Sequence, residues 1–544
     1  MPIEQPTSAQ NLRPAVGTGA AMVSTIEASA TEAALQILRE GGNAIDAAIT
    51  ANAVLSVTAQ NMCGIGGDLL AIIYDPGRES KRPEVTTLNS SGRSSRRASA
   101  SRLKSEGLRK MPRHGRIESV TVPGCVDGWI ALSERFGTLP LERLLDSAIT
   151  LAETGFASSA LLAEDAEEIS HLKGATEYRT AFKGGYSTGT IVRRPGIAKV
   201  LRSIASSGRD AFYQGDFGKE LIGISMGYFD WEDLKKSSAE WSPPVQNSAF
   251  GYQILSLPPT SQGGLTVASA AIAERIGLPM DQQDPQFLHT LIESSRLAGF
   301  DRDLWIGEGA DFDGHFSESE LDRRASMFNR SHRIQLDEST PTSGDTTALC
   351  VIDTNGMGIS LVQSNASGFG SLLFTPESQI FLHNRGIGFS LDESRPNFYS
   401  SSALPMHTLS PTLVTSDDSR LKLLTGTMGG DAQPQILLQL LATALHLGID
   451  SKTAVSNPRF VFAPQRHSGS DGFSTWDSQG EVTVLLEPTL SVTHGDSLKS
   501  LGHRVVASPR SDSTFGHAHM IKVESDAIEG FADPRSLGGL CAGI

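Results

Sequence analysis

The pattern of apolar and polar positions changes character near residue 346. In residues 29–55 apolar side chains recur at helical spacing on both sides of Gly41 and Gly42, which predicts two helices, the first capped by Thr31. Beyond residue 346 short apolar runs alternate with turn residues. The pair Asn355-Gly356 separates two such runs, 348–352 and 359–363, and predicts a β-hairpin. We therefore expect an α/β (α+β) chain whose earlier part is largely helical.

The glycine-rich residues 64–67 stand before an apolar run that predicts a strand. A phosphate-binding loop would follow a strand and open a helix, so these glycines predict a tight turn at or near a site instead. One further helix is predicted to begin after Pro123-Gly124, and others are predicted at residues 144–153, 265–275 and 435–447. Strands are predicted at 69–74 and 421–424, and a polar loop at 231–244.

Length and composition narrow the class of protein. At 544 residues the chain exceeds the usual size of a single core, which favours two lobes or one large layered domain. Its net charge of −15 argues against nucleic-acid and anionic-membrane partners, and the basic stretch at 93–116 has no interleaved aromatic residues that could stack on bases. Four scattered cysteines without a CxxC pair predict neither a zinc site nor a disulfide framework.

The localisation expected from the sequence is cytoplasmic. The first residues have no basic segment followed by an apolar one, and no run approaches 18 apolar residues, so we expect neither a signal peptide nor a transmembrane segment.

The first candidate for chemistry is Thr346, in the segment Gly344-Asp345-Thr346-Thr347 at the start of an apolar run. A threonine hydroxyl needs a base beside it to act as a nucleophile, and cleavage between Asp345 and Thr346 would supply the α-amino group of Thr346 as that base. Such an amine has a pKa of about 8 and can exchange a proton near neutral pH. An ordinary polar loop before a strand is the alternative for these residues alone.

Two further segments complete the candidate machinery. Gly429 and Gly430 lie between a predicted strand and a predicted helix, where successive backbone N–H groups can point at one oxygen; a simple connection is the equally weighted alternative. Ser364 and Asn365 lie on the second strand of the predicted hairpin, opposite the candidate nucleophile.

Together these segments resemble the γ-glutamyltranspeptidase (γ-glutamyltransferase) family of N-terminal-nucleophile hydrolases over nearly the whole chain. The residues that carry the resemblance are 37–48, 64–67, 258–263, 345–347, 410–412, 429–430 and 532–535. The resemblance implies a four-layer αββα sandwich and autocatalytic cleavage into a large subunit, residues 1–345, and a small subunit, residues 346–544. It also implies acyl-enzyme chemistry with no metal and no organic cofactor.

The resemblance assigns roles to the candidate residues. Thr346 would be the nucleophile in both autocleavage and substrate turnover, Ser364 would hydrogen-bond its amine, and the N–H groups of Gly429 and Gly430 would form the oxyanion hole. Ser364 stands where the family usually has threonine.

The sequence departs from glutathione-cleaving members of the family around the substrate. Their T-x-H-x-S pattern is replaced by residues 346–350, and Gly388 stands where an acid would hold the substrate's amino group. A zwitterionic head needs a fixed anion and a fixed cation, and the sequence supplies no such anion at the family's position. The pattern resembles a divergent branch that includes oxamate amidohydrolase-like proteins.

For that branch we expect a small amide substrate that carries a carboxylate. The residues predicted to bind it are Arg93, Arg385, His407, Thr408 and Asn365. Pairing of Arg385 with a core acid, and a hydrogen-bonded strand position for His407, are the structural alternatives. The paired histidines His517 and His519 have no third ligand nearby in sequence, which disfavours a metal site.

The leading hypothesis is therefore a self-processing threonine amidohydrolase, an enzyme acting on a small amide. The alternatives are a γ-glutamyltransferase or glutathione hydrolase, a β-lactam acylase and, from a different class, an unprocessed binding protein. The partners expected are the two subunits from one precursor, with a dimer of such heterodimers left open. Residues 533–535 are expected to form a turn with an internal ion pair, and Cys350 to pack in its strand.

Overall fold

Two seven-stranded sheets form the centre of the protein. The computed structural model describes residues 15–17, 21–77, 82–172, 187–336, 345–463, 482–524 and 527–544. The first sheet contains, in spatial order, β1 (Ala15–Gly17), β20 (Ile528–Ala532), β19 (Ala518–Val523), β15 (Leu421–Thr427), β14 (Thr412–Thr415), β9 (Tyr252–Ser256) and β8 (Val245–Ala249). The second contains β21 (Leu540–Gly543), β2 (Met22–Thr25), β10 (Asp345–Ile352), β11 (Gly358–Ala366), β3 (Asp68–Asp75), β4 (Glu84–Ser90) and β7 (Glu240–Ser242).

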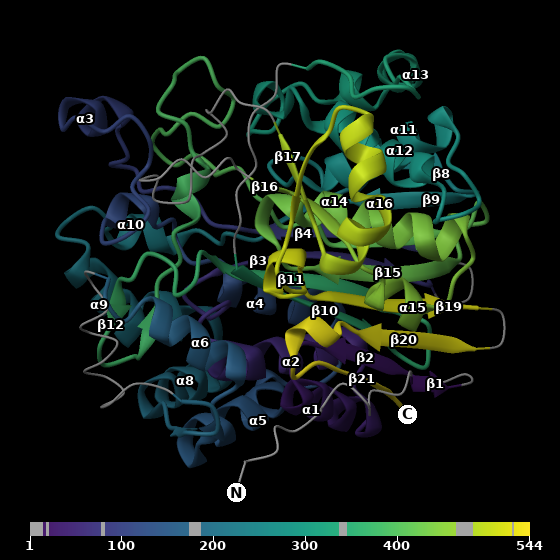
Figure 1. Ribbon diagram of the computed structural model, residues 1–544. Helices are drawn as coiled ribbons and strands as arrows, with labels where there is room; N and C mark the ends of the chain where they lie inside the picture. Colours follow the sequence, from purple (N-terminus) through teal and green to yellow (C-terminus); the bar gives the residue numbers. More distant parts are fainter. Residues whose placement is uncertain are drawn as a thin grey trace, which may run out of the picture.

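Helices cover the outer face of each sheet (Figure 1). The second sheet is covered by α1 (Ala28–Arg39), α2 (Ala44–Thr58) and α4 (Cys125–Phe136), with α5 (Leu141–Thr154) and α8 (Pro195–Tyr213) packed on them. The first is covered by α11 (Gly263–Ile276), α14 (Gln433–Leu441) and α15 (Ser451–Ser456), with α12 (Pro285–Gly299) packed on α11 and α14, and α16 (Pro488–Ser500) packed on α12. The order of layers is thus helix, sheet, sheet, helix, as predicted.

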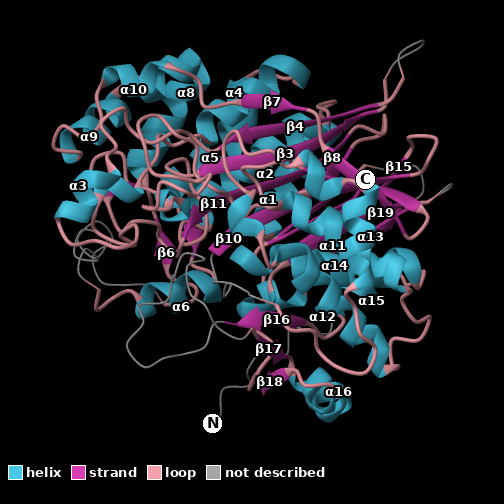
Figure 2. Ribbon diagram, turned by 90° about the horizontal axis from the view of Figure 1, so that it is seen from above, coloured by secondary structure: helices cyan, strands magenta, loops and turns pink. Residues whose placement is uncertain are grey.

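Smaller elements lie around this sandwich. They are α3 (Ala100–Ser105), α6 (Ala160–Glu168), α9 (Asp216–Ile224), α10 (Trp231–Lys235) and α13 (Glu318–Ser326), with the strand pairs β5 (Phe156–Ala157) and β6 (Ile191–Val192), and β12 (Phe374–Thr375) and β13 (Ile380–Phe381). A third sheet of β16 (Phe460–Ala463), β17 (Thr483–Leu486) and β18 (Arg504–Ala507) packs with α16 at one end of the molecule (Figure 2).

The strand β10 shows how the layers are held together. Leu349 and Val351 point into the apolar cluster beneath α1 and α2, whereas Ala348, Cys350 and Ile352 point into the cluster between the two sheets. Successive strand residues face opposite sides, so an unbroken apolar run is what a strand buried on both faces requires. The predicted packing of Cys350 is confirmed.

Local signals predicted several elements correctly. The hairpin of β10 and β11 forms with Ile352 opposite Gly358, and α1 and α2 match the predicted pair of helices. α2 begins at a capping box in which Asn43 accepts hydrogen bonds from the backbone of Ile45 and Asp46, while Asp46 accepts one from the backbone of Asn43.

Two local predictions were wrong for tertiary reasons. Thr31 does not cap α1, because the helix begins after Glu27 and the buried Thr31 hydroxyl donates instead to the carbonyl of Leu540. Residues 231–244 are not only a loop: Asp230 caps α10, and β7 adds an edge strand beside β4. No helix within the described residues is at once long enough and apolar enough to cross a bilayer.

Candidate active site

Thr346 lies near the start of β10, with its side chain 1% exposed. The register with β11 is irregular here, since Asp345 pairs with Ala366 and Thr347 with Gln363. The extra residue lies on β11, in a bulge where Ser364 and Asn365 together oppose Thr346. Across this bulge Thr346 Oγ1 lies 3.1 Å from Ser364 Oγ. Thr346 and Ser364, which the predicted hairpin placed opposite each other, are therefore in hydrogen-bond contact. Gly344 lies outside the described residues.

The glycines predicted to form the oxyanion hole follow β15 in the opposing sheet. Ser360 Oγ donates to the carbonyl of Thr425 at 2.9 Å, and a Cβ placed on Gly426 would lie 3.3 Å from that of Ala348. The strands β10 and β15 thus touch face to face, and following both toward one end leads to Thr346 on one sheet and to Gly429 on the other.

Both glycines have left-handed backbones, with φ of +133° at Gly429 and +55° at Gly430. A side chain at Gly429 would adopt this conformation rarely and would lie 3.2 Å from Ile436 Cδ1. A chain in this conformation can turn successive N–H groups toward one point, which is the geometry an oxyanion hole uses.

A buried ionic cluster lies one strand away from Ser364. Asp68, the first residue of β3, stands opposite Ser364 in the register of β3 and β11. Its Oδ2 accepts from Arg385 Nε at 2.7 Å and lies 3.0 Å from His407 Nε2 and 3.4 Å from His383 Nδ1. Arg385 Nη1 donates to Thr408 Oγ1 at 3.2 Å. Asp68 and the two histidines are fully buried, and Arg385 is 3% exposed.

The electrostatics of the cluster follow from this burial. Burial alone would raise the pKa of Asp68, but the Arg385 guanidinium, with His407 and His383, holds that pKa well below its ordinary value. Burial, together with the nearby Arg385 charge, lowers the pKa of His407 to about 4, so His407 is neutral at pH 7. The cluster then contains the carboxylate of Asp68, the guanidinium of Arg385, the neutral imidazole of His407 and the imidazole of His383.

Besides the two ring nitrogens of His407, two charged-group atoms of this cluster have no hydrogen-bond partner among the described residues. They are Asp68 Oδ1, an acceptor, and Arg385 Nη2, a donor, and both are inaccessible to solvent. Buried polar atoms are costly unless they are paired. Such a donor and acceptor beside Ser364 suit a small polar ligand that offers one acceptor and one donor.

The remaining predicted substrate residues lie in different surroundings. Arg93 is half-buried in ion pairs with Glu240 at 2.8 Å and Glu308 at 2.7 Å. Asn365 donates through Nδ2 to the carbonyl of Gln60 and through its backbone to Met62, next to the turn at residues 64–67. The structure therefore places Arg385, His407 and Thr408 together, and Arg93 and Asn365 in contacts of their own.

Sequence reasoning missed four polar residues around the site. Asp68 and Asp431 directly follow the glycine segments 64–67 and 429–430, Gln262 lies within the segment 258–263, and Arg302 lies in none of these segments. Their roles depend on contacts between residues far apart in the chain, such as Asp68 with Arg385. The only local signal was a charged or amide side chain next to a glycine-rich turn.

A cluster of metal-ligand type lies elsewhere, on α12 and after α16. His289 Nδ1 lies 2.8 Å from His503 Nε2, and Glu293 accepts from Arg296 at 2.5 Å and from the backbone of Ile334 at 3.0 Å. With the carboxylate held by a guanidinium, this network serves to tie α12 to the segment before residue 337. The paired histidines from the sequence analysis are also engaged: His517 is hydrogen-bonded to Ser513, and His519 is hydrogen-bonded to Ser24.

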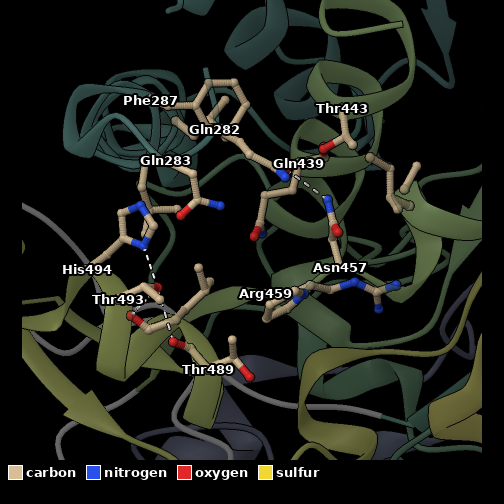
Figure 3. Close-up of a pocket in the computed structure, with 16 residues that line it drawn as sticks. Gln282, Gln283, Phe287, Gln439, Thr443, Asn457, Arg459, Thr489, Thr493 and His494 are labelled. Atoms are coloured by element: carbon tan, nitrogen blue, oxygen red, sulfur yellow. Dashed lines mark hydrogen bonds between the residues drawn. The ribbon is translucent and has the colours of Figure 1, made fainter. Parts of the chain in front are cut away.

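A separate cavity of about 110 Å³ lies among the helices that cover the first sheet (Figure 3). Phe287 from α12, Gln439 from α14 and His494 from α16 line it, and Asn457 donates to Gln282 across it at 3.1 Å. None of the residues predicted to act in catalysis lines this cavity.

The turn at 533–535 has the predicted ion pair, with Arg535 3.1 Å from Asp533.

Comparison with known proteins identifies the family. The model of the family described as Gamma-glutamyltranspeptidase matches residues 30–543. The chain belongs to the γ-glutamyltranspeptidase family. Members of this family with similar sequences include the glutathione hydrolase-like YwrD proenzyme of Bacillus subtilis (strain 168), 31% identical over 94% of this chain and 96% of its own. The oxamate amidohydrolase proenzyme of Klebsiella pneumoniae subsp. pneumoniae is 29% identical over 94% and 96%.

A solved structure shares this fold over the whole chain. Cephalosporin acylase from Bacillus halodurans is 27% identical, with a TM-score of 0.87 that covers 100% of this chain and 99% of the acylase. The γ-glutamyltranspeptidase relatives are named as hydrolases and proenzymes. This chain is therefore an enzyme with the N-terminal-nucleophile hydrolase fold, made as one precursor of a large and a small subunit.

Proposed function

We propose that this enzyme is a self-processing threonine amidohydrolase that cleaves small amides carrying a carboxylate close to the scissile bond. The observation that carries the proposal is the buried pair of unpartnered atoms, Arg385 Nη2 and Asp68 Oδ1, one strand away from Ser364 and Thr346.

Processing would begin within β10, between residues 1–345 and 346–544. Thr346 Oγ1 attacks the carbonyl carbon of Asp345, and the peptide nitrogen leaves as the free α-amine of Thr346, which gives an ester between the two residues. Water then hydrolyses the ester and leaves a carboxylate on Asp345. Ser364 Oγ, 3.1 Å from the attacking hydroxyl, is placed to hold it and to exchange a proton with it.

Turnover would reuse the same hydroxyl on a substrate amide. The α-amine of Thr346 accepts the hydroxyl proton as Oγ1 attacks, and it returns that proton to the leaving nitrogen, so that ammonia or an amine departs. Gly429 and Gly430 would stabilise the oxyanion of both tetrahedral intermediates. Water hydrolyses the acyl-threonine and restores the enzyme.

The substrate pocket supports a carboxylate next to the amide. Arg385 Nη2 is a charged donor for one carboxylate oxygen, and the Thr408 hydroxyl, 3.2 Å from Arg385 Nη1, lies within reach of the same group. Asp68 Oδ1 can accept a hydrogen bond from an amide N–H. Oxamate, in which an amide and a carboxylate share one carbon–carbon bond, offers both groups, and the likeness to an oxamate amidohydrolase proenzyme supports this choice.

A γ-glutamyl substrate is the second candidate, and one observation favours it. The sequence predicted that no fixed anion faces the site, yet Asp68 is a buried anion beside Ser364. Its Oδ1 could hold an α-ammonium group while Arg385 holds the α-carboxylate. Against this, Arg385 already neutralises Asp68 through Oδ2, which leaves little negative charge for a cation.

The Asp68→Asn variant separates the two substrates. The asparagine keeps the shape but removes the charge, so an ammonium ligand should lose about 1.5–3 kcal/mol of binding, a tenfold or larger rise in KM. The KM for oxamate should change less than that for an ammonium ligand, because oxamate loses at most one neutral N–H contact to Oδ1 while a negative charge beside its carboxylate is removed.

The test begins with the processed wild type, offered oxamate, γ-glutamyl-p-nitroanilide and a cephalosporin. Turnover of oxamate at least tenfold faster in kcat/KM than of the other two is the expected result. Fast γ-glutamyl hydrolysis that collapses in Asp68→Asn would replace the proposal with the second candidate. A chain that stays uncut and binds oxamate without turnover would instead be a binding protein.

A further inference from the structure

One amide side chain touches both the glycine loop and the substrate pocket. Gln262, fully buried between β9 and α11, donates through Nε2 to the carbonyl of Gly430 at 2.9 Å and to the carbonyl of Thr408 at 2.9 Å. Its backbone N–H donates to the carbonyl of His407 at 2.9 Å. Gln262 thereby joins Gly430, the second of the two candidate oxyanion glycines, to the two pocket residues His407 and Thr408.

The orientation of this amide is itself fixed from behind. Arg302 donates to Gln262 Oε1 at 3.3 Å, so the amide must present Nε2, and not Oε1, to the two carbonyls. Arg302 also forms a buried ion pair with Asp431, 3.3 Å to Oδ1 and 3.2 Å to Oδ2. Asp431 follows Gly430 directly, so the glycine loop is held at the Gly430 carbonyl and at the next side chain.

The segment around Gln262 has its own anchors. His407 donates through its backbone to the carbonyl of Thr260, and Ser261 Oγ donates to the carbonyl of Leu409 at 2.6 Å. Residues 260–262 and 407–409 therefore run side by side as a fixed unit. A shift of Gln262 would move the two pocket residues and the glycine loop relative to each other.

We infer that Gln262 is a positioning residue that sets the spacing between the carboxylate-binding groups and the oxyanion glycines, and so selects the length of the substrate. This inference rests on the proposed function. Arg385 and Thr408 would hold the carboxylate end, and Gly429 and Gly430 would receive the scissile carbonyl oxygen. One side chain bonded to both groups fixes the distance over which a substrate must reach.

The physical consequence is selectivity for the number of carbons between carboxylate and amide. Productive attack needs reacting atoms about 3–3.5 Å apart, and a misplacement of about 1 Å can cost on the order of 100-fold in rate. Oxamate has no carbon between its two carbonyl groups, and malonamate has one. An enzyme with a fixed spacing should discriminate between them, and one with a relaxed spacing should not.

The test compares Gln262→Met with Gln439→Met, a buried glutamine on α14 that bonds to Gln435 and Phe460 and touches neither group. Methionine keeps the length of glutamine and removes its donors. For Gln262→Met we expect kcat on oxamate to fall 10- to 100-fold per active site, with a smaller change in KM, and the oxamate-to-malonamate ratio of kcat/KM to fall at least tenfold. Gln439→Met should keep both quantities within twofold of wild type.

On the two acid amides, either of two results would overturn the inference: an unchanged length ratio in Gln262→Met, or the same fall in both variants, which would indicate a general loss of packing. Rates are normalised to the amount of free Thr346 N-terminus, so incomplete folding or cleavage does not mimic the effect. A wild type that hydrolyses neither acid amide refutes the proposed function instead. The same variants are then compared on γ-glutamyl-p-nitroanilide, where an unchanged kcat for Gln262→Met would also overturn the positioning role.

Discussion

Arg385 Nε lies 2.7 Å from Asp68 Oδ2, in a pair that is almost completely buried beside Ser364. A buried ion pair of this kind is weak evidence for stability, since desolvation offsets much of the attraction. Its position is more informative. The pair fixes the orientation of Arg385 and leaves Nη2 without a partner within the described part of the chain, so a guanidinium donor is held ready next to the candidate nucleophile.

The self-processing step depends on the Thr346 hydroxyl. Thr346→Ala should remain one uncut chain without amidase activity, whereas Thr346→Ser, which keeps a hydroxyl, should still be cleaved. Denaturing gel electrophoresis and N-terminal sequencing of the smaller fragment measure this, and the fragment should begin at residue 346. An active enzyme that stays in one piece, or a fragment that begins elsewhere, would contradict the mechanism.

The same substitution, arginine to methionine, tests which of the two candidate arginines binds the substrate carboxylate. Arg385→Met should raise the KM for oxamate 10- to 100-fold, because a charge-assisted hydrogen bond contributes about 1.5–3 kcal/mol. Arg93→Met should change KM less than threefold, since its guanidinium is engaged by Glu240 and Glu308. Steady-state kinetics on the processed variants decide between them. The reverse order of effects would move the carboxylate site to Arg93.

The oxyanion loop can be tested through its backbone conformation. Gly429→Ala should lower kcat on the order of 100-fold, because an alanine at φ +133° and 3.2 Å from Ile436 would displace the loop. Gly448→Ala is the control, as this glycine also has a positive φ of +66° but no atom within 4 Å of the added Cβ. Equal kcat values for the two variants would argue against an oxyanion role.

Loss of the Arg302–Asp431 pair should show in stability. Asp431→Asn removes the carboxylate that forms a buried ion pair with Arg302, and breaking a buried pair in this way costs about 3–5 kcal/mol. Asp418→Asn removes an exposed partner of Arg420 and should cost less than about 1 kcal/mol. Urea unfolding of the two variants compares the costs, and similar midpoints would show that the Asp431 carboxylate is not needed by Arg302.

Stability should also depend on pH through His519. Burial lowers its pKa to about 3, below the 6.5 of the unfolded chain, so the unfolded state binds the extra proton as the pH falls below 6.5. This contribution to stability is therefore complete above pH 6.5 and is lost toward acid, by about 1.4 kcal/mol for each pH unit.

The His519→Gln variant isolates that contribution. Glu27 acts in the opposite direction, because burial raises its pKa to about 7 and its contribution is lost as the pH rises. Glu27 is present in both wild type and His519→Gln, so subtracting their unfolding free energies cancels its contribution. We expect this free-energy difference to shrink in magnitude or reverse between pH 7 and 5. A difference that stays constant would refute the lowered pKa of His519.

The predictions that succeeded depended on residues close together in the chain. Asn355-Gly356 fixed the hairpin, and the hairpin fixed the closeness of Thr346 and Ser364, because antiparallel neighbours follow from a short turn. The prediction for Thr31 failed, since a hydroxyl that could cap a helix was instead used by the backbone of Leu540. Asp68 was overlooked for a related reason: its partners Arg385 and His407 lie more than three hundred residues further along the chain.

The sequence by itself determined the family, the layered class of fold and the identity of the candidate nucleophile, because these depend on ordered motifs and on local periodicity. The tertiary structure decided the surroundings of the nucleophile. It placed Asp68 against Arg385, took Arg93 into other ion pairs and joined Gln262 to both the glycine loop and the pocket. Those contacts arise where the two sheets and their covering helices meet. Buried charged and amide groups there must find partners, and the fold supplies those partners from distant parts of the chain, so local sequence does not reveal them.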